Sequence, residues 1–123
     1  ILGLGGKKYS KDHIKGTAEV ISACSPNYVG ALTLYLENGI KQEFIQKWEG
    51  EFVKINDDES LEELYDLINQ INTKEEIVFR VNHGSNAYTV KGTFPEDKQE
   101  MLDKVEWMKE HPEIVRPQGI RGF

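Results

Sequence analysis

The stretch DDESLEELYDLINQINTKEEIVFRVN, residues 57–82, decides the fold because it joins a clear amphipathic helix to a strand. Apolar residues recur in it at the three- and four-residue spacing of one helix face, namely Leu61, Leu64, Ile68 and Ile71. Asp57 or Asp58 can cap this helix, and Ser60 and Glu63 have capping-box spacing. The closing EIVFRVN is rich in the branched and aromatic side chains that favour a strand.

The same alternation extends upstream. ILGLGG, residues 1–6, predicts a strand that ends in a glycine-rich loop. The following residues predict a helix with Ser10 as its N-cap, and one face of that helix carries Ile14, Thr17, Val20, Ile21 and Cys24. YVGALTLYL, residues 28–36, is a nearly continuous apolar run, which suits a strand covered on both faces. KQEFIQKWEG, residues 41–50, indicates a short helix.

Downstream, the polar stretch RVNHGSNAYTVKGTFPEDK, residues 80–98, separates the strand at 76–82 from a last helix. Pro95 suits a first helical position, and the apolar face of this helix is formed by Met101, Leu102, Val105 and Met108. His111 and Pro112 end it. Residues 112–123 have too few periodic apolar positions to predict an element, so we expect a tail.

The order strand, helix, strand, helix, helix, strand, helix predicts an α/β domain with parallel strands joined by right-handed crossovers. Its 123 residues suit a single domain over residues 1–123. Three strands make a small sheet with bare edges, which are a liability. We therefore expect missing strands on at least one side, and the absence of an initiator methionine leads us to expect a piece of a longer protein.

Composition excludes several classes of function. Asp and Glu number 21 against 15 Lys and Arg, and the positive charges are scattered, so binding to nucleic-acid phosphates is disfavoured. Apolar runs are too short to cross a membrane and ILGLGG is no secretory signal, so we expect a cytoplasmic protein. A single cysteine, Cys24, excludes an internal disulfide framework and an all-cysteine metal site made by this chain alone.

Two segments fall where an α/β sheet binds ligands, at the carboxyl ends of its strands. GLGG, residues 3–6, lets backbone approach a ligand, although it lacks GxGxxG spacing and a GKS/T sequence; a purely structural turn remains open. The end of the 28–36 strand places Thr33, Leu34, Tyr35 and Glu37 at the same face, while the rest of that strand is expected in the core.

The polar loop contains His83, Ser85 and, further on, Asp97, the side chains of a nucleophilic triad. Spacing argues against that reading, because a serine two residues from its histidine on an extended chain points in parallel with it and no G-x-S-x-G elbow is present. The histidines and Cys24 also lack metal-ligand spacing such as HExxH or CxxC. Asn82, His83 and Asn86 can instead bind a ligand or simply form a turn, and residue types leave both open.

Three pieces in this order carry a family resemblance. ILGLGGKKYSKDHIKGTAEVISACSPNYVGALTLYLENG resembles the second half of radical S-adenosylmethionine (radical SAM) iron-sulfur oxidoreductases, similar to the methylthiotransferase and oxygen-independent coproporphyrinogen oxidase groups. GEFVKINDDESLEELYDLINQI and NHGSNAYTVKGTFPEDKQEMLDKVEW resemble the region further downstream, where an H-x-x-N-Y-like loop leads into a G-x-x-P-x-D-K helix. The resemblance covers nearly the whole chain.

The resemblance implies that the chain is the carboxyl-terminal half of a partial (β/α) barrel and needs the amino-terminal half of the same protein as its partner. S-adenosylmethionine and a [4Fe-4S] cluster would be the cofactors of that parent enzyme, and none is expected on this chain alone because the CxxxCxxC that holds the cluster is absent. The resemblance assigns Gly3, Gly5, Gly6, Thr33, Leu34 and Tyr35 to the cofactor, and His83, Gly84 and Asn86 to the pocket wall. It implies no catalytic acid, base or nucleophile here.

Two rival interpretations remain. The chain could be a self-contained small α/β binding or interaction domain in which both glycine-rich loops are only turns. A hydrolase that uses Ser85 is a third interpretation. For the isolated chain we expect a homodimer, since exposed sheet edges and an uncovered sheet face tend to pair with another copy.

Overall fold

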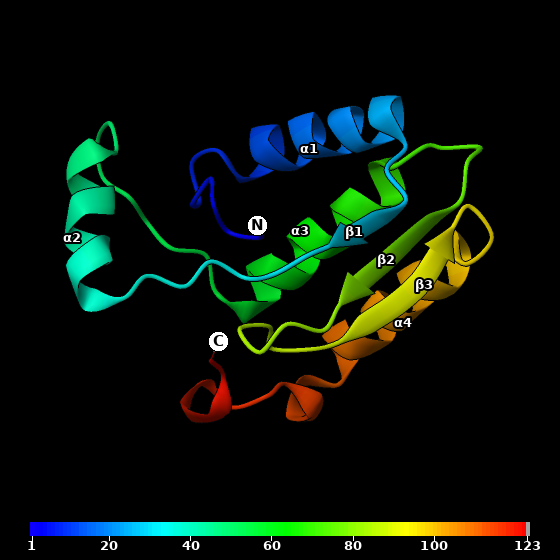
Figure 1. The fold of residues 1–123 in the computed structure, drawn as a ribbon. Helices are drawn as coiled ribbons and strands as arrows, with labels where there is room; N and C mark the ends of the chain where they lie inside the picture. The colour runs from blue at the N-terminus through cyan, green and yellow to red at the C-terminus, as the bar shows by residue number, and fades with distance from the viewer. Residues whose placement is uncertain (123) are drawn as a thin grey trace.

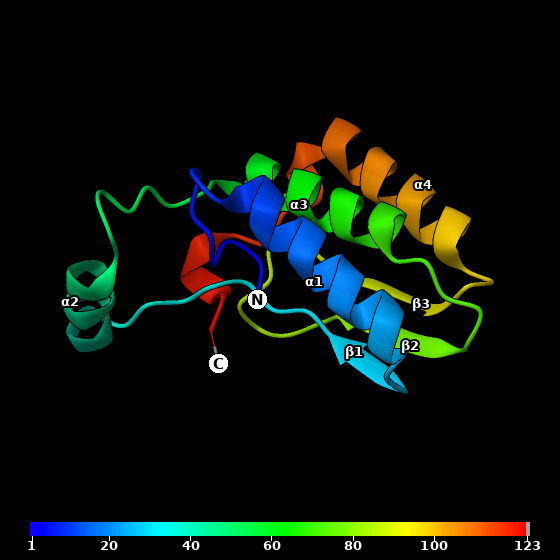
Figure 2. The same ribbon diagram turned by 90° about the horizontal axis from the view of Figure 1, so that it is seen from above.

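The computed structural model describes residues 1–122, which form one layer of helices packed on a small mixed β-sheet. Figures 1 and 2 show α1, α3 and α4 on the same side of the sheet, while the opposite side of the sheet carries no helix in residues 1–122. The α-helices and strands are α1 Ser10–Cys24, β1 Tyr28–Gly30, α2 Asn38–Lys47, α3 Asp57–Gln70, β2 Ile77–Val81, β3 Val90–Phe94 and α4 Lys98–Glu110. Two 3-10 turns follow, η1 Pro112–Ile114 and η2 Gln118–Ile120.

The sheet has the order β1-β2-β3, with β1 parallel to β2 and β2 antiparallel to β3. The α/β class is therefore correct, but the expectation of parallel strands throughout is wrong for β3. This strand lies within the stretch 80–98, which sequence had predicted as a loop. β3 alternates buried Val90 and Phe94 with the exposed Lys91, and Gly92 lies against Met101 of α4. Because polar residues surround this short strand, its apolar residues do not form a recognisable alternating pattern in the sequence.

The predicted strands at the start of the chain are shorter than expected. Residues 1–4 contribute one parallel bridge, between Leu2 and Thr33, rather than a strand. The Leu2 N–H donates to the Leu32 carbonyl at 2.8 Å, and the Leu34 N–H donates to the Leu2 carbonyl at 2.9 Å. Of the run 28–36, only Tyr28–Gly30 belongs to β1. Beyond β1 the chain pairs with residues 1–4, again in a parallel arrangement, through the Leu2–Thr33 bridge.

α1 and α3 match their predicted positions, whereas α2 lies at Asn38–Lys47 rather than at 41–50, and the helix caps differ from those predicted. α3 begins after Asn56, whose side chain accepts from the Glu59 N–H while Glu59 accepts from the Asn56 N–H, so the capping box is formed by this pair. Ser10 does not cap α1, because its hydroxyl donates to Glu63 instead. Pro95 precedes α4, which starts at Lys98, rather than occupying its first position.

The core lies between the sheet and the helices. Ile77, Phe79 and Val81 of β2 point into it and are completely buried, and α3 contributes Leu64 and Ile68. The alternate residues of the strands, among them Tyr28, face the uncovered side. α2 stands apart from this core and contains no buried residue (Figure 1). No helix formed by residues 1–122 is long and apolar enough to cross a membrane.

Residues 112–122 are not a free tail, because they fold back along the end of the sheet. The Arg116 N–H donates to the Ala87 carbonyl at 2.6 Å, and the Gly122 N–H donates to the Gly84 carbonyl at 3.1 Å. Residues 116–122, the last part of this segment, are called the C-terminal strap below.

Candidate functional site

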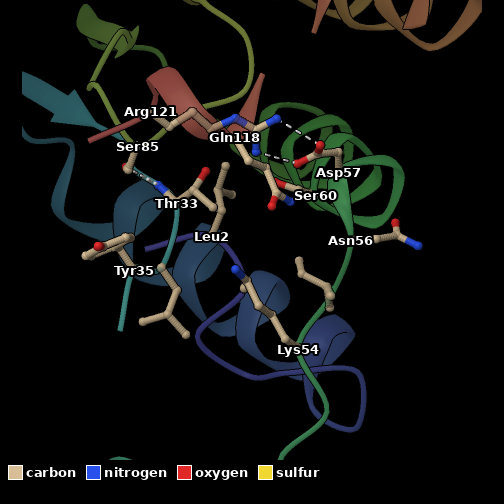
Figure 3. Close-up of a pocket in the computed structure, with 13 residues that line it drawn as sticks. Leu2, Thr33, Tyr35, Lys54, Asn56, Asp57, Ser60, Ser85, Gln118 and Arg121 are labelled. Atoms are coloured by element: carbon tan, nitrogen blue, oxygen red, sulfur yellow. Dashed lines mark hydrogen bonds and ion pairs between the residues drawn. The ribbon is translucent and has the colours of Figure 1, made fainter. Parts of the chain in front are cut away.

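A cavity of about 430 Å³ opens at the carboxyl ends of the parallel segments of the sheet (Figure 3). Its wall is assembled from five parts of the chain, which are residues 2–3, residues 33–35, residues 54–57 with Ser60, Ser85, and the C-terminal strap. Ligands of open α/β sheets bind at this end of the strands, where the connecting loops leave a crevice. The cavity, called the main pocket below, is therefore the candidate functional site.

Gly3 lines the main pocket and is held in place by a buried hydrogen-bond network. Its φ of 82° lies in the left-handed region that favours glycine, and its N–H donates to Oε2 of Glu63 at 2.7 Å. The other oxygen of Glu63 accepts from the Ser10 hydroxyl, also at 2.7 Å. Because Glu63 is only 2% exposed, it fastens the loop of Gly3 to α3 from within.

Gly5 and Gly6 lie outside the main pocket, in a separate shallow hollow together with Trp48 and Val53. Gly6 has a φ of 59°, and a Cβ there would lie 2.9 Å from the ring of Phe52. Of the three glycines predicted to approach a cofactor, the structure thus places only Gly3 at the pocket wall.

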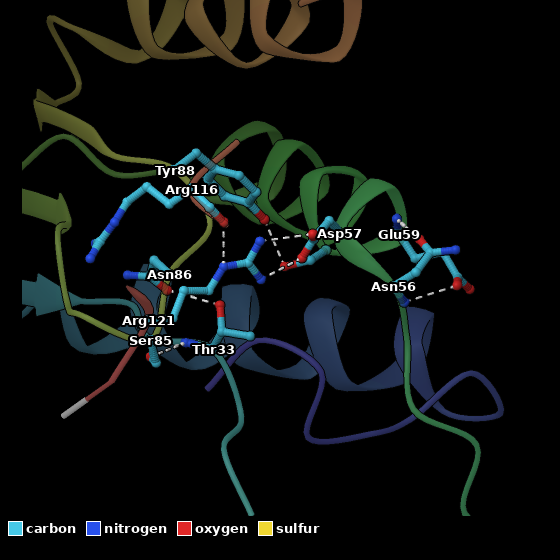
Figure 4. Close-up of polar contacts among 10 residues, drawn as sticks. Thr33, Asn56, Asp57, Glu59, Ser85, Asn86, Tyr88, Arg116 and Arg121 are labelled. Carbon is cyan, nitrogen blue, oxygen red and sulfur yellow. Dashed lines mark hydrogen bonds and ion pairs between the residues drawn. The ribbon is translucent and has the colours of Figure 1, made fainter. Parts of the chain in front are cut away.

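Thr33, Leu34 and Tyr35 all line the main pocket, as predicted from the carboxyl-end rule. The Thr33 N–H donates to Oγ of Ser85 at 3.2 Å, and its hydroxyl donates to Oδ1 of Asn86 at 2.9 Å. Figure 4 shows these contacts joining Thr33, in the segment that follows β1, to the loop after β2. Tyr35 is 51% exposed and stands at the rim.

In the loop after β2, Ser85 is the residue that reaches the pocket wall. Asn86 is completely buried, and its Nδ2 donates to the Ala31 carbonyl at 3.0 Å, so it ties the loop to the neighbouring segment. Gly84 lies beneath the strap, where an added Cβ would collide with the Gly122 carbonyl. His83, Gly84 and Asn86 therefore support the pocket from behind rather than lining it.

His83 and Ser85 meet, contrary to the argument from an extended chain, because residues 84–85 form a turn. Nδ1 of His83 lies 2.9 Å from Oγ of Ser85, and it also accepts from the Ser85 N–H at 3.2 Å. The Asp97 carboxylate instead accepts from the Thr93 N–H at 2.8 Å, at the start of α4. Residues 1–122 therefore do not assemble a Ser-His-Asp triad around Ser85.

The charged wall of the main pocket comes from residues that sequence reasoning did not select as site residues. Nη1 and Nη2 of Arg121 each donate to one oxygen of Asp57 at 2.9 Å, a bidentate ion pair between the strap and the start of α3 (Figure 4). Nε of Arg121 donates to the Arg116 carbonyl at 2.7 Å. Arg121 and Asp57 are 64 residues apart, so no local pattern signals their contact.

Tyr88 and Ser60 form a buried polar pair beside this ion pair. The Tyr88 hydroxyl donates to Oγ of Ser60 at 2.6 Å, and both residues are at most 4% exposed. Burial raises the pKa of the Tyr88 phenol far above its ordinary value of 10, so it remains a neutral donor. Ser60 therefore presents its hydroxyl at the pocket wall in a fixed position.

Residues 1–122 contain no group of three His, Cys, Asp or Glu side chains placed to hold a metal ion. Cys24 is exposed at the last position of α1. The side chains of residues 1–122 therefore do not form a ligand set for an iron-sulfur cluster.

Comparison of the chain with protein-family models, with curated proteins and with solved structures found no match in any of the three.

Proposed function

We propose that this chain is the carboxyl-terminal half of the partial (β/α) barrel of a radical SAM iron-sulfur oxidoreductase, and that it supplies walls of the cofactor and substrate pocket. One observation carries the proposal: Gly3 and Thr33, Leu34 and Tyr35, which the family resemblance assigns to the cofactor, line one cavity at the carboxyl ends of parallel segments. Enzyme pockets of β/α barrels lie at that end of the strands.

The residues present fit an S-adenosylmethionine molecule better than they fit the cluster. The cavity of about 430 Å³ is within the range of small-molecule sites, and it combines the Gly3 backbone with the apolar Leu34 and the ring of Tyr35. Leu34 and Tyr35 would contact the nucleoside part, and Gly3 and Thr33 would form the wall beside it. When bound beside a cluster, S-adenosylmethionine supplies radical chemistry. Ligands for that cluster must come from another part of the parent enzyme.

The proposed partner is the amino-terminal half of the same protein. The side of the sheet opposite α1, α3 and α4 is uncovered in residues 1–122 (Figure 2). The 57% exposed Tyr28 of β1 lies on that side. At one edge the chain offers only the single bridge at Leu2, which leaves backbone groups available for another strand. An adjoining half-barrel would cover both the edge and the face.

The test uses the parent protein, purified without oxygen and reconstituted with iron and sulfide. We expect it to cleave S-adenosylmethionine reductively and to release 5′-deoxyadenosine. Leu34→Asp, which puts a carboxylate into the pocket wall, should raise the Kd for S-adenosylmethionine while the cluster absorbance stays unchanged. Leu36→Asp, outside the main pocket, is the matched control. A parent protein that takes up no cluster contradicts the proposal.

The second candidate is a self-contained α/β binding domain without catalysis. It is favoured by a core that closes within this chain, in which Ile77, Phe79 and Phe94 of the sheet are completely buried by the chain's own helices. The two candidates differ in cofactor dependence. A parent protein that binds small molecules in the main pocket but neither holds a cluster nor cleaves S-adenosylmethionine supports the second.

A further inference from the structure

Most polar groups of the main pocket already have partners inside the protein. The Gly3 N–H is bound by Glu63, and both polar groups of Thr33 are bound by Ser85 and Asn86. The Asn56 side chain caps α3. Glu63, the buried carboxylate behind Gly3, accepts hydrogen bonds at both oxygens. These groups build the wall, and a ligand must be recognised by other groups.

Three donor groups of the lining carry the argument, beside the side-chain amide of Gln118, which can both donate and accept. Within residues 1–122 the Lys54 ammonium has no carboxylate within ion-pair distance. The Ser60 hydroxyl, which is 4% exposed, accepts from Tyr88 and keeps its own proton free. Arg121 uses one N–H of each Nη on Asp57 and retains the second. Figure 3 shows Lys54 and Arg121 reaching the pocket from opposite sides.

The charge of the lining has the opposite sign to that of the chain. Lys54 and Arg121 provide two positive charges against the one of Asp57, whereas the whole chain carries a net charge of −6. Inside a partly closed cavity such charges act more strongly than on an open surface, because less water screens them. The lining also contains apolar side chains, namely Leu2, Leu34 and Ile55. The pocket thus has a cationic donor part and an apolar part.

We propose that the main pocket binds an organic anion whose carboxylate or phosphate lies between Lys54 and Arg121 and accepts a hydrogen bond from Ser60. The apolar part of the ligand lies against Leu2 and Ile55, beside the wall that the proposed function assigns to the nucleoside. This inference rests on the proposed function and deepens it, since it names the substrate class as a small organic acid. Lys54 is a binding residue for that acid, and Arg121 serves both the ligand and the strap.

The test titrates four probes of similar size into the isotope-labelled chain and follows the backbone amide signals by NMR. Benzoate and phenyl phosphate carry an anionic group, benzyl alcohol is neutral and benzylamine is a cation. We expect benzoate and phenyl phosphate to shift the amides of Thr33, Ser60, Ser85 and Gln118 in a saturable way. Whichever anion binds more tightly identifies the acidic group. Equal or tighter binding of benzylamine overturns the inference.

Variants then locate the anion. Lys54→Met should weaken benzoate binding about tenfold, the loss expected for one charge-assisted contact, and Lys54→Arg should largely restore it. Lys15→Met changes the net charge of the chain by the same amount as Lys54→Met. Lys15 is an exposed residue of α1, so this variant should leave binding unchanged. Equal affinities for Lys54→Met and Lys15→Met overturn the inference. So does the absence of saturation by any probe, whereas the proposed function fails only on cluster uptake and S-adenosylmethionine cleavage in the parent protein.

Discussion

Glu63 is a buried carboxylate whose two oxygens are occupied by the Gly3 N–H and the Ser10 hydroxyl. Glu63→Ala removes both acceptors and leaves the buried Gly3 N–H and the partly buried Ser10 hydroxyl without partners. We expect it to lower the free energy of unfolding by about 2–4 kcal/mol, because each buried donor that loses its partner costs roughly 1–3 kcal/mol. Urea denaturation followed by circular dichroism measures this loss.

Glu63→Gln separates hydrogen bonding from charge. The amide oxygen can still accept from Gly3, and the amide nitrogen can donate to the Ser10 oxygen, so we expect a loss of about 1 kcal/mol or less. A loss as large as that of Glu63→Ala would show that the charge of Glu63, and not its two hydrogen bonds, holds the loop.

Tyr88 makes stability depend on pH in alkaline solution. Burial raises the pKa of its phenol above the ordinary value of 10, so the unfolded chain loses this proton near pH 10 while the folded chain retains it. The contribution of Tyr88 is fully present below pH 10 and is lost as pH rises toward its folded pKa. Above pH 10 it should remove about 1.4 kcal/mol of unfolding free energy per pH unit.

Tyr88→Phe isolates this effect. At pH 7 the variant should be about 1 kcal/mol less stable than the natural protein, since Ser60 loses its buried donor. Urea denaturation at pH 9 and pH 11 should show the difference shrinking or reversing, because phenylalanine does not ionise. A difference that stays constant over this range would mean that Tyr88 ionises alike in both states.

At the residue scale, sequence reasoning located the part of the site that follows from strand direction. Thr33, Leu34 and Tyr35 line the pocket because the end of a parallel segment places them there. Lys54 and Arg121 could not be found in this way. Lys54 is placed by the way the chain returns to the sheet after α2, and Arg121 by the way the strap folds back. No local sequence pattern predicts either return.

The strap is the element that closes one side of the main pocket, and Gly84 is where it docks. Gly84→Ala would place a methyl group against the Gly122 carbonyl. We expect it to release the strap, so that the amides of Arg116 and Gly122 lose protection from hydrogen exchange. The Arg121–Asp57 ion pair should break as well.

Gly119→Ala is the matched control for this prediction, since it adds the same methyl group within the strap where a Cβ meets no atom within 4 Å. Its amide protection should match that of the natural protein. Unchanged protection of Gly122 in Gly84→Ala would show that the strap docks without needing a glycine beneath it.

At the element scale, long periodic segments were predicted well and short ones were not. α3 and β2 lie within about a residue of the stretches that predicted them, because each carries a regular apolar face. β3 was missed, since Lys91, Gly92 and Thr93 lie between its two buried ends. β3 is held in place by its pairing with β2, and the sequence of five residues alone does not reveal that pairing.

For the whole molecule, the uncovered side of the sheet predicts self-association. Tyr28 is 57% exposed there, beside bare strand edges, and such surfaces pair readily. We expect sedimentation equilibrium to show a concentration-dependent dimer that Tyr28→Lys weakens. Trp107→Lys, at a 42% exposed aromatic residue of α4 in the helical layer, should leave the dimer intact. A monomer at every concentration would contradict the prediction.

Because α2 is isolated from the core, the segment that contains it can be replaced without disturbing the rest of the fold. Phe44, Trp48 and Phe52 pack mainly on one another and on Tyr9, and no residue of α2 is buried in the main core. Residues 38–50 could be replaced by a short glycine-serine connection, or by a foreign peptide grafted in their place, while the rest keeps its cooperative melting transition. Residues 38–50 are thus a place where a foreign peptide can be inserted near the main pocket.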